Sequence, residues 1–213
     1  MKRILTILLL ALSIGNVRAQ QSTNVSKTVS TGEKKQNDKA FLSAYFQQTY
    51  DALERSVTGL SAAQLNFKPS PEQWSINQCL EHIVLTERML FDEAQKNMQS
   101  PASPKRRKDV KVSDEEIIKG ISDRSHKAKA PDALIGEGKY STASQALEEL
   151  QRDRKLVFDY LSPRSLDDMR NHVSDTPFGA TDGYHSFLYI AGHTARHTGQ
   201  IEALKAEASF PQK

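Results

Sequence analysis

The chain has 213 residues, which suits one ordinary domain with a tail, and its formal net charge is +3. Its single cysteine, Cys79, excludes an internal disulfide, so the fold must depend on a hydrophobic core. Of the 29 Lys and Arg residues, three lie in the first nineteen positions, and the other 26 balance the 26 Asp and Glu residues. A neutral remainder excludes strong attraction to nucleic acid or anionic lipid, and we expect neither as a partner.

Residues 1–19 have the pattern of a secretory signal peptide. Lys2 and Arg3 precede the apolar run "ILTILLLALSIG", and "VRA" places small residues before Gln20. The apolar run is short for a membrane span, which needs about 20 residues, so we expect cleavage after Ala19 and no stable membrane anchor. The alternative is an uncleaved N-terminal anchor. The pattern predicts an exported protein, periplasmic or secreted.

Residues 20–38 are predicted to be a disordered polar spacer, because their only apolar side chains are two valines. A helical domain is then expected over 39–208, with a short tail at 209–213. Its first helix, at about 39–58, places five side chains on one stripe: Leu42, Tyr45, Phe46, Thr49 and Leu53.

The second helix is predicted at about 76–98, because Ser75 and Gln78 form a capping box after the loop "KPSPEQ". Its inner stripe would contain Cys79, His82, Ile83, Thr86, Met89 and Leu90.

The third helix, at about 142–161, starts with a second capping box, Thr142 with Gln145, and ends at "SPRS". The fourth, at about 182–208, follows "DTPFGATDG" and has an inner stripe of Ser186, Tyr189, Ile190, His193, His197, Ile201 and Leu204.

A long polar connection at 99–140 separates the second and third helices. It contains one short helical candidate at 114–123, capped by Ser113 with Glu116. No stretch of the chain alternates convincingly with period two. The predicted fold class is therefore all-α, a four-helix bundle with a long connection between helices 2 and 3.

Three histidines on inward stripes suggest a metal site. His193 and His197 are four residues apart, so their imidazoles project from the same face of the fourth helix, a spacing that zinc sites on helices use. His82, on the inner stripe of the second helix, is the natural third ligand. Polar groups on a core face need hydrogen-bond partners or a metal, and three neutral imidazoles on one divalent ion leave a fourth position for water.

Two motifs give the chain a family resemblance. "FKPSPEQWSINQCLEHI" (67–83) followed by "HTARHTGQI" (193–201) resembles the DinB-like family of four-helix bundles. The shared pattern is a Trp-Ser helix start, a histidine one to two turns later and a late H-x-x-x-H-x-x-Q. The resemblance covers about 39–208, although the motifs occupy only the second and fourth helices.

The resemblance implies a divalent metal, zinc or nickel above all, bound by His82, His193 and His197. Gln200 matches the family's glutamine one turn after the pair, where it would orient a ligand or substrate without titrating. Family members include metal-dependent hydrolases and thiol-dependent transferases. Reduced thiol cofactors are cytosolic, so the export pattern favours a hydrolase that uses metal-bound water.

Two alternatives remain: a thiol-dependent S-transferase, and a non-catalytic bundle that binds a metal or a small ligand. Catalysis would need a general base, and no carboxylate clearly belongs to the inner face beside the histidines. The small-molecule substrate is not indicated by any motif. A homodimer is an open expectation that no exposed stripe demands.

The other candidate residues have simpler expected roles. Cys79 lies three residues before His82 and is expected to be a small core residue rather than a ligand or nucleophile. His185 is expected at the rim of the site or apart from it. The remaining groups are expected to be solvated in loops: His126, His172 and the basic run "KRRK" at 105–108. Tyr45, Thr49 and Thr86 lie within reach of a metal, but packing is their expected role.

Overall fold

The computed structural model describes residues 38–125, 129–176 and 179–212. The expected signal peptide and residues 20–37 of the expected spacer lie outside the described residues, as does His126. In the described part of the chain, no helix is both long and apolar enough to cross a membrane.

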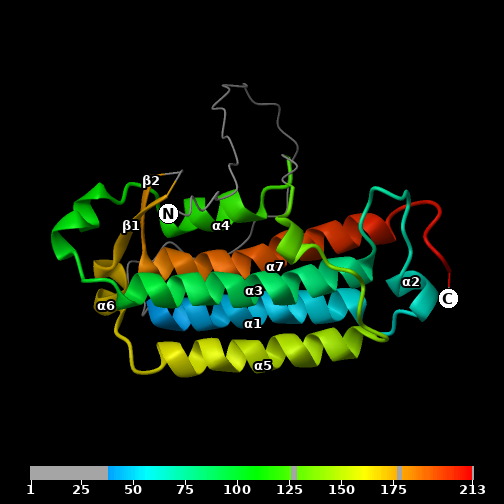
Figure 1. The fold of residues 1–213 in the computed structure, drawn as a ribbon, viewed down its shortest axis with the longest axis horizontal. Helices are drawn as coiled ribbons and strands as arrows, with labels where there is room; N and C mark the ends of the chain where they lie inside the picture. Colours follow the sequence, from blue (N-terminus) through cyan, green and yellow to red (C-terminus); the bar gives the residue numbers. More distant parts are fainter. Residues whose placement is uncertain (1–37, 126–128, 177–178, 213) are drawn as a thin grey trace, which may run out of the picture.

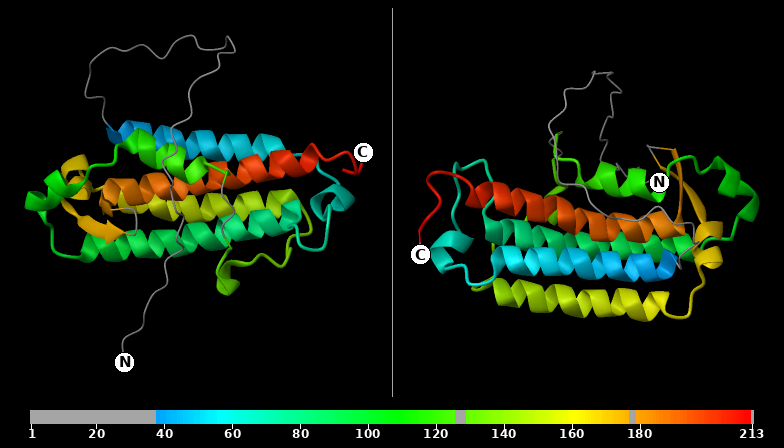
Figure 2. Two further views of the ribbon diagram at one scale, coloured as in Figure 1. Left: turned by 90° about the horizontal axis from the view of Figure 1, so that it is seen from above. Right: turned by 180° about the vertical axis from the view of Figure 1, so that it is seen from behind.

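Four long helices form the body of the molecule: α1 (Asp38–Val57), α3 (Ile76–Gln99), α5 (Ala143–Leu161) and α7 (Gly183–Lys205). They lie side by side, with α1 and α7 running one way and α3 and α5 the other (Figures 1 and 2). Both α1 and α3 contact α5 and α7, so the four helices close a square. The predicted four-helix bundle is confirmed, and its helix boundaries agree to within about a turn.

Shorter elements cap the ends and cover one side: α2 (Ala62–Leu65), η1 (Pro104–Asp109), α4 (Asp114–Ser122), η2 (Asp132–Leu134), α6 (Leu166–Asn171), β1 (Val173–Thr176) and β2 (Gly179–Asp182). The sequence prediction missed the hairpin, in which Val173 faces Asp182 and Thr176 faces Gly179. Four-residue strands are too short for an alternating pattern to stand out. The fold is therefore mainly helical, with one small two-stranded sheet.

The predicted caps form as expected at the starts of α3 and α4. The side chains of Ser75 and Ser113 accept from the backbone N–H groups of Gln78 and Glu116. The side chains of Gln78 and Glu116 in turn accept from the backbone N–H groups of the two serines. The helical candidate in the long connection is therefore real. The "KRRK" run, expected in a loop, instead lies in η1, where it is exposed and where Arg106 and Arg107 pair with Asp175 and Asp167.

Helix α7 is buried on most of its circumference, because it contacts α1, α3 and α4. Phe187 and Leu188 are fully buried, whereas Tyr189, predicted to face inward, is 36% exposed. The single stripe drawn from the sequence was therefore wrong at this end of α7. A helix with three neighbours has no single inner face.

The apolar core is divided in two. One cluster includes Leu53, Ile83 and Ile201, and the other includes Phe46, Val157 and Phe187. Between the clusters lies a layer of buried polar residues to which every long helix contributes: Thr49, Thr86, Glu87, Arg154, His193, Thr194, His197 and Thr198.

An ion pair occupies this polar layer and connects all four helices. Glu87 of α3 and Arg154 of α5 are 2% and 3% exposed, and their closest N–O distance is 2.6 Å. Arg154 also donates to the Phe46 carbonyl and the Thr49 hydroxyl of α1, while the Thr194 hydroxyl of α7 donates to Glu87. Thr49 is therefore committed to this pair.

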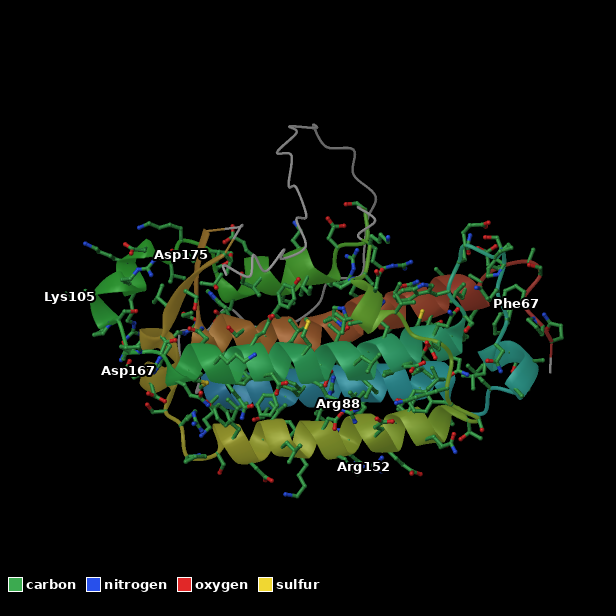
Figure 3. The ribbon with its side chains drawn as sticks, viewed as in Figure 1. Phe67, Arg88, Lys105, Arg152, Asp167 and Asp175 are labelled. Carbon is green, nitrogen blue, oxygen red and sulfur yellow. The ribbon has the colours of Figure 1, made fainter. Side chains whose placement is uncertain are left out.

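The same two helices are also joined at the surface. Arg88, which Figure 3 shows between α3 and α5, pairs with Glu149 and Asp153 at 2.7 Å each. Because Arg88 is 44% exposed, this contact contributes little compared with the buried pair.

Helix α4 is docked on α7 by a second charged cluster. Asp114, at the start of α4, accepts from Arg170 of α6 at 2.6 Å and lies 2.9 Å from Nε2 of His185 on α7. Arg170 also pairs with Asp182 at 3.0 Å. Farther along α7, a Cβ at Gly192 would lie 2.3 Å from Ile121 of α4, so glycine permits the close approach.

The positions of two other histidines can now be compared with expectation. His185 is buried at the α4 junction, which agrees with the expectation that it lies apart from the three-histidine site, whereas His172, expected to be solvated in a loop, is not. His172 is only 8% exposed, because it lies between the end of α6 and the start of β1 rather than in an open loop.

Arg154→Met should lower the free energy of unfolding by about 3–5 kcal/mol, because it leaves the Glu87 carboxylate buried without its counter-charge. Urea denaturation measures the change. Adding Glu87→Met should recover part of the loss. Lys155→Met, at the exposed neighbouring position, is the control and should change stability by less than about 1 kcal/mol. If Arg154→Met and Lys155→Met lowered the free energy of unfolding equally, the assigned role of the Glu87–Arg154 pair would be contradicted.

Asp114→Asn should cost stability in a pH-dependent way. Burial alone would raise the pKa of Asp114, but hydrogen bonds from His185 and Arg170 outweigh it and lower that pKa from 3.8 to about 2. Above pH 4, the free energy of unfolding of the wild type should therefore exceed that of the variant by about 2 kcal/mol. This difference should disappear as the pH falls toward 2. Urea denaturation of both proteins from pH 6 to pH 2.5 measures it, and a difference independent of pH would refute the assignment.

Candidate metal centre

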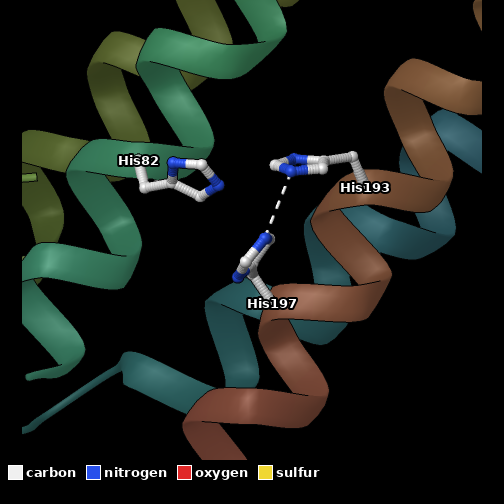
Figure 4. Close-up of side chains that lie close together, drawn as sticks. All are labelled: His82, His193 and His197. Atoms are coloured by element: carbon white, nitrogen blue, oxygen red, sulfur yellow. Dashed lines mark hydrogen bonds between the residues drawn. The ribbon is translucent and has the colours of Figure 1, made fainter. Parts of the chain in front are cut away.

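The three predicted histidines meet between α3 and α7. His82 projects from α3 toward His193 and His197 of α7 (Figure 4). One ring nitrogen from each residue lies within 4.8 Å of the others. The side chains are nearly buried, with residue exposures of 5%, 8% and 8%. Among the described residues, this is the one group of three or more His, Cys, Asp or Glu residues with metal-ligand spacing.

Hydrogen bonds orient two of the three rings. Nδ1 of His82 donates to the carbonyl of Leu134 at 2.6 Å, and Nδ1 of His197 donates to Oε1 of Gln200 at 2.9 Å. A carbonyl oxygen can only accept, so these contacts place the ring proton on Nδ1 and leave a lone pair on Nε2. Gln200, predicted to orient a ligand or substrate, thus accepts from His197, with the amide oxygen assigned from the hydrogen-bond network.

The third ring has an unsatisfied nitrogen. Nε2 of His193 lies 3.1 Å from Nε2 of His197. Because Nε2 of His197 carries a lone pair, Nε2 of His193 carries the ring proton and donates it to that nitrogen. Its Nδ1 is buried and has no hydrogen-bond partner among the described residues. A metal on Nε2 of His193 would move the ring proton to Nδ1, which would still have no partner among the described residues, so this buried atom does not by itself argue for a metal.

The electrostatic surroundings keep all three imidazoles neutral. Burial lowers the pKa of His82, and it lowers that of His193 well below the usual range, with a further contribution from the two neighbouring histidines. Burial and the nearby His82 lower the pKa of His197 to about 3. Neutral imidazole is the form that binds a metal.

These residues fit a divalent metal. Two nitrogens bound to one zinc ion in tetrahedral geometry lie about 3.3 Å apart, and the His193 and His197 nitrogens are separated by 3.1 Å. Three neutral nitrogen donors suit zinc or nickel, whereas magnesium and calcium prefer oxygen ligands.

An aromatic side chain forms one wall of the cluster. The ring of Trp74, immediately before α3, lies 4.8 Å from that of His82 and stacks at 6.5 Å on that of His197. The Thr86 hydroxyl lies 3.3 Å from Nδ1 of His82. Thr86 therefore reaches the histidine cluster, although at Nδ1 of His82 and not at Nε2.

The other candidates lie outside the cluster. The Tyr45 ring packs on Phe41, and its hydroxyl approaches Gly192 beside α4. Cys79 is fully buried in the apolar core, and burial raises the pKa of its thiol to about 12. This agrees with its expected role as a small core residue, because a thiol with that pKa is not a nucleophile at neutral pH.

Two buried carboxylates lie on α3 near the histidines, although the sequence showed none clearly there. Glu87 is bound by Arg154 and Thr194, and Glu81 accepts from three backbone N–H groups of the long connection. Both are therefore already engaged, and among the described residues neither forms a hydrogen bond or an ion pair with a histidine ring.

Sequence reasoning missed the Leu134 carbonyl. It lies in η2, within the 99–140 connection that was expected to be only polar. Every residue has a backbone carbonyl, so no pattern could single this one out.

A surface groove between α1 and α5, lined by Phe46, Tyr50 and Phe158 among others, contains none of the histidines.

Comparison with known proteins agrees with the fold and the motifs. A curated relative, the uncharacterized protein YuaE of Bacillus subtilis (strain 168), is 28% identical over 152 residues, which cover 70% of this chain and 88% of that protein. No solved structure matches significantly. The family model of the DinB superfamily matches residues 45–201. The chain therefore belongs to the DinB superfamily.

Proposed function

We propose that this protein is an exported metal-dependent enzyme whose metal is held by His82, His193 and His197. A hydrolase is the preferred activity, and a transferase is the second choice. The observation that carries the proposal is the convergence of three neutral imidazoles, two of them fixed with Nε2 unprotonated. Zinc or nickel is the proposed ion. Export is proposed from the signal-peptide pattern of residues 1–19.

A divalent ion held by three histidines supplies a Lewis acid with an open position for water or a substrate oxygen. The chain contributes orientation and exclusion of bulk water. Leu134 and Gln200 hold two of the imidazoles, and the Trp74 ring lies against the same two, T-shaped with His82 and stacked on His197. Among the described residues, the two buried carboxylates near the histidines, Glu81 and Glu87, are both engaged and so neither is free to act as a base.

A second candidate is a metal site that only stabilises the bundle. The near-complete burial of the three rings favours it, because a catalytic ion needs access to its substrate. Metal binding is common to both candidates, and turnover separates them.

Metal analysis tests the site. The purified mature protein should contain about one zinc or nickel ion per chain by elemental analysis, and His82→Ala and His193→Ala should each remove most of it, because two imidazoles bind far more weakly than three. His172→Ala, which removes an imidazole elsewhere, is the control and should retain the metal. Equal and substoichiometric metal in all four proteins would rule out the site.

Turnover tests the hydrolase. With zinc or nickel bound, the wild type should hydrolyse an activated ester such as p-nitrophenyl acetate faster than His193→Ala by at least about 100-fold. Chelation should abolish the activity, and the added ion should restore it. Bound metal that raises the melting temperature without turnover of ester, amide or thiol-transfer substrates would support the structural candidate instead.

A further inference from the structure

We infer that Glu81 is a positioning residue for the metal site: it holds residues 134–140 of the long connection on α3, so that the Leu134 carbonyl fixes the tautomer and orientation of His82. The inference rests on the proposed metal site. It assigns the connection between the second and third helices a role in that site.

Glu81 binds this segment through its carboxylate. One carboxylate oxygen accepts from the backbone N–H groups of Glu137, Gly138 and Lys139, at 2.7, 2.7 and 3.2 Å. Glu81 is only 7% exposed, so these charge-assisted bonds are shielded from water. Three converging N–H groups satisfy the buried carboxylate, which would otherwise be costly.

Two neighbours on the same face of α3 hold the segment on either side. The amide nitrogen of Asn77 donates to the carbonyls of Gly138 and Tyr140, and its oxygen accepts from the Tyr140 N–H. The amide of Gln78 donates to the Gly136 carbonyl. Residues at i, i+1, i+4 and i+5 share one side of a helix, so Asn77, Gln78 and Glu81 lie on the same side of α3 as His82.

The segment lies directly against the helix. A Cβ added at Gly136 would lie 2.2 Å from the Gln78 carbonyl oxygen, so only glycine allows this approach. Gly138 has a φ of +85°, which also favours glycine. Between Leu134 and the Glu81 contacts there are only two residues, so the position of the Leu134 carbonyl follows from where Glu81 holds the chain.

The consequence concerns His82. With the Leu134 carbonyl 2.6 Å from Nδ1, the proton remains on Nδ1 and Nε2 is available to a metal. Without that acceptor, Nδ1 keeps its longer contact with the Thr86 hydroxyl at 3.3 Å, which can donate as well as accept and so allows both tautomers. Loss of such an orienting partner typically costs 10- to 100-fold in metal affinity.

Two readouts on the whole mature protein test this role in Glu81→Gln and Glu81→Ala. In the metal-free protein, the ¹⁵N chemical shifts of the His82 ring should change from a pure Nδ1–H tautomer to a mixture, and the amides of 137–139 should exchange faster with solvent. Zinc affinity, measured by competition with a chelating dye, should fall by at least about 10-fold in Glu81→Ala and less in Glu81→Gln, which retains an acceptor oxygen.

Asp182→Asn is the matched control. Asp182 is a similarly buried carboxylate that binds Arg170 at the opposite end of α7, so its loss should affect stability but neither the His82 tautomer nor zinc affinity. An unchanged His82 tautomer in both Glu81 variants, or an equal loss of zinc affinity in the control, overturns the inference. If Glu81→Ala does not fold, Glu81→Gln decides. If the wild type binds no metal, the proposed function fails, and the tautomer readout still tests the role of Glu81.

Discussion

The buried Glu87–Arg154 pair is the constraint on which the arrangement of the bundle depends. Two apolar clusters alone would allow the helices to slide and rotate, because hydrophobic contact is not directional. The pair contacts α1, α3, α5 and α7 at one level, and the low dielectric makes any mismatch costly. Glu87 follows His82 by five residues and Thr194 follows His193 directly, so the contact that aligns α3 with α7 also aligns the histidines.

The long connection completes the site that the bundle begins. Two helices bring three imidazoles together, but the bundle offers Nδ1 of His82 the Thr86 hydroxyl at 3.3 Å, which can donate as well as accept and so does not fix the tautomer. The connection supplies the Leu134 carbonyl, while α4 packs on α7 beside Gly192, the residue before His193. The proposed metal site therefore combines histidines on rigid helices with an orienting carbonyl from a loop, which is why the contacts between α3 and that loop matter to the proposal.

Much of the fold could be predicted from local patterns. The Ser75 and Ser113 caps and the helical periodicity act within a few residues, so the helices were found with nearly correct ends. The predictions failed where the answer depended on distant neighbours. Tyr189 is 36% exposed although periodicity placed it on the inner stripe, His172 is buried between α6 and β1, and the hairpin itself was too short to show a period.

The sequence by itself determined the helical bundle, the family and the identity of the three histidines, because spacing along a helix places His193 and His197 on one face and the Trp-Ser motif marks His82. Only the tertiary structure decided which groups surround them. It pairs Thr49 and Glu87 with Arg154 by hydrogen bonds, Glu81 with the backbone N–H groups of 137–139, and the Leu134 carbonyl with His82. Those partners lie dozens of residues apart in the chain, and one of them is a backbone atom that every residue carries, so no local pattern encodes the choice.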